Sequence, residues 1–214
     1  MRRKKTGAAA TLLGAIAEAE ATTTAQGEED LHALKGLLKQ FLQKDTSPER
    51  AALKREYDLG CPLTGSGGLR RKLGAIDMEF FGRAYFPHYF SRPSPEFHRE
   101  LDNIWQQGVL KGRTPLTPAA ARAINRLPGV RRVVAAPRGH AKSTNLTFKG
   151  TMHSALYEYK HYPIIISDSS DQAEGFLDNI RVEFEENGAI RTDFGDLAGP
   201  VWRANVLVTK SNIK

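Results

Sequence analysis

The stretch of this sequence best suited to chemistry is residues 131–144, which read RRVVAAPRGHAKST. An apolar run leads into a short turn, and Lys142 and Ser143 then open a segment with helical character. A turn between a strand and a helix N-terminus is typical of loops that hold phosphates, because the backbone N–H groups there point at the anion. In this arrangement N–H groups of residues 139–144 would cradle the phosphates, Lys142 would contact the β- and γ-phosphates, and Ser143 would ligate Mg²⁺. The stretch therefore predicts a site for ATP with magnesium.

The loop departs from the general pattern G-x-x-x-x-G-K-[ST], because Ala136 and Ala141 stand where the pattern has glycines. Gly139 lies between them. Alanine restricts φ, so we expect Ala141 to adopt a negative φ. Arg138 adds a second cation, which we assign to stabilising charge on the transferred phosphoryl group. His140 has the chemistry of a catalytic base, but a loop-shaping or solvent-exposed histidine is the favoured interpretation.

The elements predicted around this loop change character at residue 131. Before it, apolar residues at helical spacing and Ser-Pro-Glu starts predict helices, which we place at 29–43, 47–57, 76–90, 94–105 and 117–127. After it, we expect strands at 132–136, 162–167 and 206–209, with helices at 142–157 and 169–184. Strands alternating with helices predict a parallel sheet with helices on both faces. The predicted fold is α/β, with a partial parallel sheet of the P-loop NTPase type after a helical N-terminal extension.

Charge and cysteine content bound the class of protein. The formal net charge is +7. Residues 1–130 carry 20 Lys and Arg against 14 Asp and Glu, whereas residues 131–214 carry 11 against 10. A basic excess of this kind favours a polyanionic partner such as duplex DNA. The one cysteine, Cys61, allows no disulfide within the chain and fits a reducing compartment.

The N-terminal region has a basic head, Arg2–Lys5, followed by an Ala-rich run. Glu18 and Glu20 follow this run at once, which argues against a signal peptide. No segment approaches the roughly 20 apolar residues of a membrane helix, so we expect a cytoplasmic protein with no membrane partner. Residues 1–30 are expected to be mobile, and Arg2–Lys5 are interpreted equally well as a DNA-contacting arm or a solvated tail.

Several other groups have a chemical and a structural interpretation. Residues 64–68, TGSGG, are interpreted as a flexible linker rather than a phosphate loop, since no strand precedes them. The aromatic stretch 80–90 could stack nucleobases, but a core helix is favoured. Asp168 could approach the phosphates, but capping of the next helix by Ser169 or Asp171 is favoured. Three glutamates are interpreted as a solvated helix face rather than a carboxylate site: Glu183, Glu185 and Glu186.

Residues 135–144, AAPRGHAKST, resemble the variant phosphate-binding loop of the large terminase subunit of tailed bacteriophages, the ATP-driven DNA-packaging motor. Two segments before the loop, FFGRAYFPHYF at 80–90 and FHREL at 97–101, resemble the lead-in of one terminase group. After the loop, IIISD at 164–168 with Gln172 and Ala173, Glu185 to Asn187, Asp193 to Gly195, and Trp202 add to the likeness. The resemblance covers residues 76–209 in order and spacing.

The resemblance implies an N-terminal ATPase joined to a C-terminal nuclease. We divide the chain into a helical extension with a mobile basic start over 1–68, a helical lead-in over 69–130 and an incomplete ATPase core over 131–214, and residues 1–70 carry no part of the resemblance. Arg138 is the implied catalytic residue and Ser143 the implied magnesium ligand. The implied nucleotide-binding residues are Pro137, Arg138, Gly139, His140, Ala141, Lys142, Ser143 and Thr144. The implied partners are duplex DNA, the small terminase subunit and the portal protein, within an oligomer in the bacterial host cytoplasm.

The sequence also departs from that family. The apolar stretch 206–209 is followed by Lys-Ser, without the acidic pair that would hold magnesium, and no coupling motif or nuclease carboxylates are seen. We therefore expect the front half of the ATPase only, with no turnover by the isolated chain. The alternative is a non-catalytic remnant or adaptor that binds nucleotide or a partner protein without turnover. In that case the helices at 29–57 would form the contact within an oligomer or with the partner. A P-loop helicase or an ATPase regulator is a third interpretation.

Overall fold

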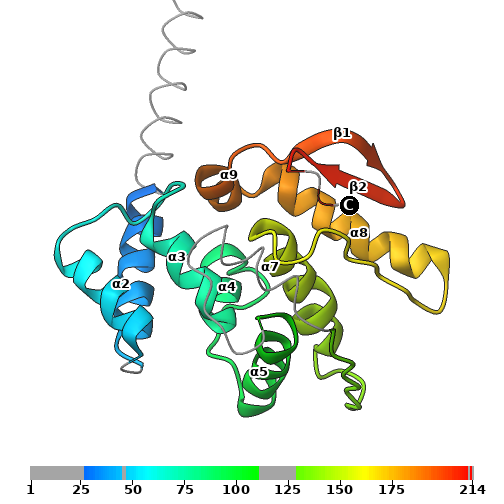
Figure 1. Ribbon diagram of the computed structural model, residues 1–214, viewed down its shortest axis with the longest axis horizontal. Coiled ribbons are helices and arrows are strands. Elements are labelled where there is room, and N and C mark those ends of the chain that lie inside the picture. Colours follow the sequence, from blue (N-terminus) through cyan, green and yellow to red (C-terminus); the bar gives the residue numbers. More distant parts are fainter. Residues whose placement is uncertain (1–26, 45–46, 111–128, 212, 214) are drawn as a thin grey trace, which may run out of the picture. The chain divides into compact units, whose positions relative to one another are not determined.

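The computed structural model describes residues 27–44, 47–110, 129–211 and 213 (Figure 1). Its contacts divide the chain into two units, 1–41 and 42–214. In the first unit the chain is helical from residue 27. Leu34, Leu38 and Phe41 are buried there, as the helical spacing predicted. The predicted mobile basic start and the predicted helix at 117–127 lie outside the described residues.

The second unit is mostly helical. The helices that start at Pro48, Glu96 and Ser170 begin at predicted capping signals, whereas those that start at Leu69 and Gly188 were not predicted from the sequence. Pro48 occupies the first turn of its helix, where its missing N–H costs nothing. None of the helices within the described ranges is long and apolar enough to cross a membrane. The helices are α2 (Pro48–Asp58), α3 (Leu69–Ile76), α4 (Met78–Tyr85), α5 (Glu96–Leu110), the π-helix η1 (Ser143–Gly150), α7 (Thr151–Leu156), α8 (Ser170–Glu186) and α9 (Gly188–Phe194).

The predicted parallel sheet with helices on both faces is wrong. The described residues contain one two-stranded antiparallel sheet, in which β1 (Ala198–Arg203) pairs with β2 (Val206–Thr209). The predicted strands at 132–136 and 162–167 have no hydrogen-bonded neighbour strand among the residues that the structure describes. A periodic apolar run makes a strand only when another strand lies beside it, and the described chain supplies such a neighbour to β2 alone.

The partner of β2 escaped the sequence analysis because its Gly-Pro dipeptide interrupts the apolar pattern. A Cβ atom at Gly199 would lie 2.0 Å from the Val208 carbonyl oxygen, so only glycine permits this approach of the two strands. The ladder then pairs Val201 with Val208 and Trp202 with Leu207. A register irregularity lies between Ala198 and Val201.

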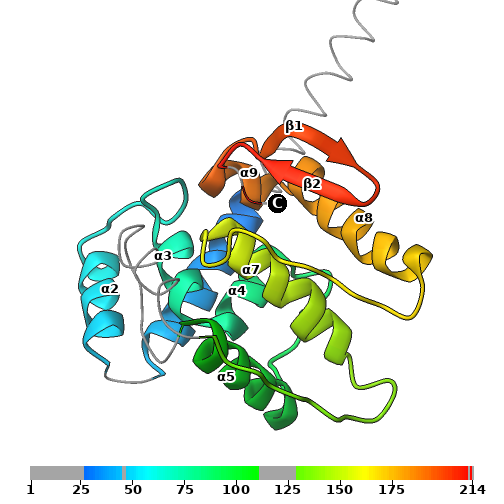
Figure 2. The same ribbon diagram turned by 45° about the vertical axis from the view of Figure 1, so that its right-hand side comes forward.

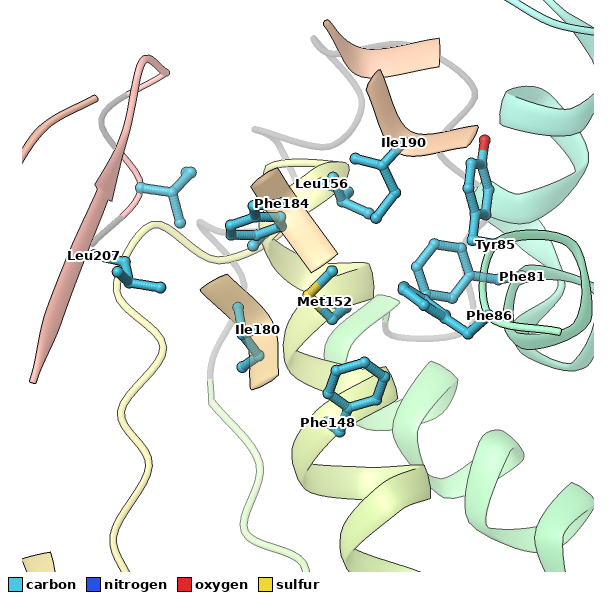
Figure 3. Close-up of a cluster of buried hydrophobic side chains, with 12 residues drawn as sticks. Phe81, Tyr85, Phe86, Phe148, Met152, Leu156, Ile180, Phe184, Ile190 and Leu207 are labelled. Carbon is cyan, nitrogen blue, oxygen red and sulfur yellow. The ribbon is translucent and has the colours of Figure 1, made fainter. Parts of the chain in front are cut away.

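The main core of the second unit forms around the aromatic residues of α4 (Figure 3). Phe81 and Tyr85 meet Met152 of α7, and Phe184 of α8 approaches from the far side. The core interpretation of the aromatic stretch is therefore confirmed, although Tyr89 is half exposed. The remaining labelled members of this core are Phe86, Phe148, Leu156, Ile180, Ile190 and Leu207. This packing joins the helix after the candidate loop to both α4 and α8.

Residues 64–68 form a compact turn rather than a flexible linker. The N–H group of Gly65 donates to Oδ1 of Asp193 at 2.6 Å. A Cβ atom at Gly68 would lie 2.4 Å from the backbone of Thr64, so the turn is tight. Amino-acid composition contains no information on such long-range hydrogen bonds, so the glycines of this segment predicted flexibility instead. The domains assigned to 1–68, 69–130 and 131–214 stay predictions.

Candidate phosphate-binding loop

The backbone of the candidate loop reverses direction in a left-handed turn between the irregular segment 131–137 and η1. Gly139 has a φ of +78° and Ala141 a φ of +48°. The expected negative φ of Ala141 is therefore wrong, because the turn needs the left-handed conformation that glycine supplies in the general pattern. For an alanine this conformation costs roughly 1–2 kcal/mol. The loop thus stores backbone strain at the residue directly before Lys142.

Histidine contacts hold the loop in shape. The Nδ1 of His140 donates to the carbonyl of Arg138 at 3.0 Å, and the Nε2 of His98 on α5 donates to the His140 carbonyl at 3.1 Å. The ring of Phe97 also meets the His140 ring edge-on. His140 remains solvent-exposed. These contacts agree with the loop-shaping interpretation of His140 rather than with a catalytic base.

The cations of the loop have no carboxylate of the described ranges against them. Within the described part of the chain, neither Arg138 nor Lys142 forms an ion pair, and Arg138 is exposed. Lys142 is half-buried, and its Nζ lies 3.5 Å from the Pro137 carbonyl, a contact too long to hold it. The loop therefore presents two uncompensated positive charges at one turn.

Hydrogen-bond donors lie beside these charges. The N–H of Asn145 donates to the Ala141 carbonyl at 2.9 Å, and the N–H groups of residues 142–144 precede it at the helix start. The first N–H groups of a helix have no acceptor within it. The Ser143 hydroxyl is exposed next to them, and Thr144 is half-buried. Cations, N–H donors and a hydroxyl make a donor set that fits a phosphate group.

Magnesium is a separate question from phosphate. Ser143 supplies one hydroxyl oxygen, and a single hydroxyl does not hold a divalent cation without further oxygen ligands. No cluster of three or more His, Cys, Asp or Glu side chains lies among the residues that the structure describes. The loop therefore fits a magnesium ion that arrives with, and is shared by, the phosphates of a nucleotide.

Behind the loop, the helix carries a buried polar row at intervals of four residues, formed by Asn145, Lys149 and His153. The Nζ of Lys149 lies 2.6 Å from Oδ1 of Asp102 on α5, and the lysine is fully buried. Burial lowers the pKa of Lys149 and raises the pKa of Asp102, while their attraction opposes both changes. The row ties the loop-bearing helix to α5, and the π-helical form of η1 is a form often found at functional sites.

His153 continues this row toward α3. Its Nε2 donates to the Gly74 carbonyl at 3.0 Å. Burial lowers the pKa of His153 to about 3, so the imidazole is neutral at pH 7. This row was not predicted from the sequence, although polar residues at every fourth position beside Phe148 and Met152 were a readable signal.

The other candidate residues have mostly structural roles. The Ser169 hydroxyl accepts a hydrogen bond from the Gln172 N–H at 3.3 Å, so the capping interpretation is confirmed for Ser169. Asp168 is exposed and lies apart from any ion pair in the described chain. The solvated-face interpretation is wrong for Glu183, which is buried and contacts His88 Nε2 at 2.7 Å. Its neighbours in the sequence, Glu185 and Glu186, are exposed as expected.

Comparison of the chain with protein-family models, with curated proteins and with solved structures finds no significant match. A functional assignment therefore depends on the residues of the loop and on their geometry.

Proposed function

We propose that residues 136–144 bind the phosphates of ATP with Mg²⁺, and that the chain is the N-terminal ATPase portion of a DNA-packaging motor. In this proposal it resembles the large terminase subunit of tailed bacteriophages. The observation that carries the proposal is the left-handed backbone of Ala141, with its φ of +48°. Backbone strain in a non-glycine residue clusters at ligand-binding and catalytic sites, because a working geometry is kept at the cost of stability.

The strained turn has a simple use in this proposal. It places the N–H groups at the start of η1 directly after Arg138 and Lys142 in the chain, and these two residues add positive charge. The helix dipole also favours an anion at this end. These features need only the turn and the helix N-terminus, so the proposal does not depend on a parallel sheet, which the described residues do not form.

Each residue then has a role in the proposed site. Lys142 neutralises charge on the outer phosphates, Ser143 offers its hydroxyl to the metal, and Arg138 stabilises charge on the γ-phosphoryl group. ATP supplies the phosphoryl group whose hydrolysis drives DNA movement in the resembled family. The positive net charge of +7 favours duplex DNA as a further partner.

A second candidate function is nucleotide binding without turnover. It is favoured by the chemistry of the loop, where cations and hydroxyls gather and no carboxylate of the described chain contacts them. Phosphoryl transfer in P-loop proteins also needs an acidic residue to hold the metal. An assay of phosphate release by the full chain separates the two functions, since only the ATPase releases phosphate in a Lys142-dependent manner.

Replacement of Lys142 tests the site itself. We expect Lys142→Ala to weaken ATP-Mg²⁺ binding at least tenfold in a calorimetric titration, because a cation beside the phosphates contributes about 1.4 kcal/mol or more. The control is Lys54→Ala, which removes the same charge from an exposed i,i+4 pair on α2. Full affinity in Lys142→Ala, or an equal loss in Lys54→Ala, would contradict the assignment.

A further inference from the structure

The segment between α7 and α8 leaves a row of apolar side chains in solvent. Residues 162–166, Tyr-Pro-Ile-Ile-Ile, run as an extended stretch of irregular chain, drawn in yellow between the two helices (Figure 2). Tyr162, Ile164 and Ile166 are 65%, 68% and 89% exposed, whereas Ile165 packs against the core. Exposure that alternates with a period of two is the pattern of a β-strand covered on one face only.

The backbone of this segment is also available for pairing. None of the described residues forms a backbone hydrogen bond with residues 162–166. Hollows border the segment on both sides: one of about 420 Å³ toward α8 and β2, and one of about 380 Å³ toward α5 and η1. A row of unpaired N–H and C=O groups beside exposed apolar side chains is a template for a further strand.

We propose that this segment is a dimer interface, in which residues 160–168 of two copies of the chain pair as antiparallel strands about a twofold axis at Ile164. In this register Ile164 faces its own copy, and Tyr162 faces Ile166 of the second chain. Each of these side chains lies on the face that is exposed in the single chain. Antiparallel pairing therefore sets the apolar row beside an identical row on the same face, where opposite side chains contact each other, as a twofold interface requires.

Charge complementarity identifies a second copy as the occupant. The same register places Lys160 of one chain opposite Asp168 of the other, and the twofold axis repeats this contact at the far end. Asp168 is exposed and has no ion-pair partner in the part of the chain described. Opposite charges that face each other across strands stabilise the pairing, and a shift of register would separate them.

Pro163 is compatible with this pairing. In an antiparallel ladder the hydrogen-bonded pairs fall on alternate residues, which here are 160, 162, 164, 166 and 168. Pro163 then faces Ile165 in a non-hydrogen-bonded pair, where its missing N–H removes no bond between the strands. Proline is tolerated in a strand at just such a position, with the N–H side turned away from the partner.

Sedimentation equilibrium of the full chain over a range of concentrations tests the proposal. We expect a monomer–dimer equilibrium that Ile164→Lys weakens at least tenfold, because two like charges would meet at the axis. The control is Val182→Lys, the same substitution at a half-exposed apolar residue on α8, which should leave dimerisation unchanged. A monomer at every concentration, or equal effects of the two substitutions, would overturn the proposal.

A charge exchange separates the proposed register from unspecific apolar association. Asp168→Lys should weaken the dimer several-fold by opposing Lys160, and the double variant Lys160→Asp/Asp168→Lys should restore it. Circular dichroism of each variant checks that the fold is kept. Association that ignores both charge changes would show that another surface joins the copies and would also overturn the proposal.

Discussion

Ala141 has the most unusual backbone of the candidate loop, and a single atom decides its cost. Its Cβ makes the left-handed conformation unfavourable, and the same conformation is free of this penalty in glycine. The turn nevertheless keeps it, because the contacts of His140 and the start of η1 determine the path of the chain on either side. The left-handed geometry of Ala141 therefore lowers the stability of the folded chain.

The strain at Ala141 predicts the sign of a substitution. Ala141→Gly should raise the free energy of unfolding by roughly 0.5–1 kcal/mol, because relief of the left-handed strain outweighs the entropy that glycine adds to the unfolded chain. Urea denaturation followed by circular dichroism measures the change. Ala135→Gly is the control and should lower stability, since Ala135 has no positive φ to relieve. Destabilisation of equal size in both variants would show that the backbone of Ala141 is not strained.

At the scale of elements, the buried ion pair between α5 and η1 positions the loop-bearing helix. Lys149 is fully buried and Asp102 nearly so, and the Nζ of Lys149 also lies 4.9 Å from the centre of the Phe90 ring. Taking both charges out of water is costly, so the pair adds little net stability but strongly penalises the loss of either partner. Any placement of the helix that separates Lys149 from Asp102 is therefore penalised.

A double-mutant cycle should show that the contributions of Asp102 and Lys149 to stability are coupled. Asp102→Asn should cost about 3–5 kcal/mol, because it leaves the Lys149 charge buried and uncompensated. The double variant Asp102→Asn/Lys149→Met should recover more than half of this loss, as measured by urea denaturation. Asp58→Asn, which breaks an exposed pair with Lys54, should cost less than about 0.5 kcal/mol. Additive losses at Asp102 and Lys149 would argue against the coupling.

On the scale of the whole second unit, Asp193 joins segments that lie more than a hundred residues apart in the sequence. Its carboxylate accepts bonds from Gly65 N–H at 2.6 Å, from Arg70 at 2.7 and 2.9 Å, and from the Tyr85 hydroxyl at 2.6 Å. Burial raises the pKa of Tyr85 well above its ordinary value, so this hydroxyl remains a donor. One buried carboxylate thus holds the 64–68 turn, α3, α4 and α9 together.

Loss of this carboxylate should destabilise the whole second unit. We expect Asp193→Ala to lower the free energy of unfolding by about 3 kcal/mol or more, since Arg70 stays buried without its counter-charge. Thermal and urea unfolding would measure the loss. Asp196→Ala, on an exposed carboxylate paired with Lys210, is the matched control and should leave stability unchanged. A tolerant Asp193→Ala would show that packing alone joins these segments.

The sequence by itself determined what depends on neighbours a few positions away. The Pro48 and Ser169 helix starts, the aromatic core residues of α4 and the loop-to-helix turn before Lys142 all follow from such local signals. Helix capping and helical periodicity act within one or two turns, so short windows of sequence contain them. The chemical character of the loop could be predicted on the same basis.

Only the tertiary structure decided what depends on distant partners. The apolar runs at 132–136 and 162–167 did not become a parallel sheet, because strand formation needs a neighbour that local pattern cannot supply. Glu183 became buried and Asp193 became a hub through contacts about a hundred residues away. Ala141 took a left-handed φ because the ends of its turn are held elsewhere. Pairing, burial and strain are properties of the assembled chain, since each is a contact between segments that the sequence keeps apart.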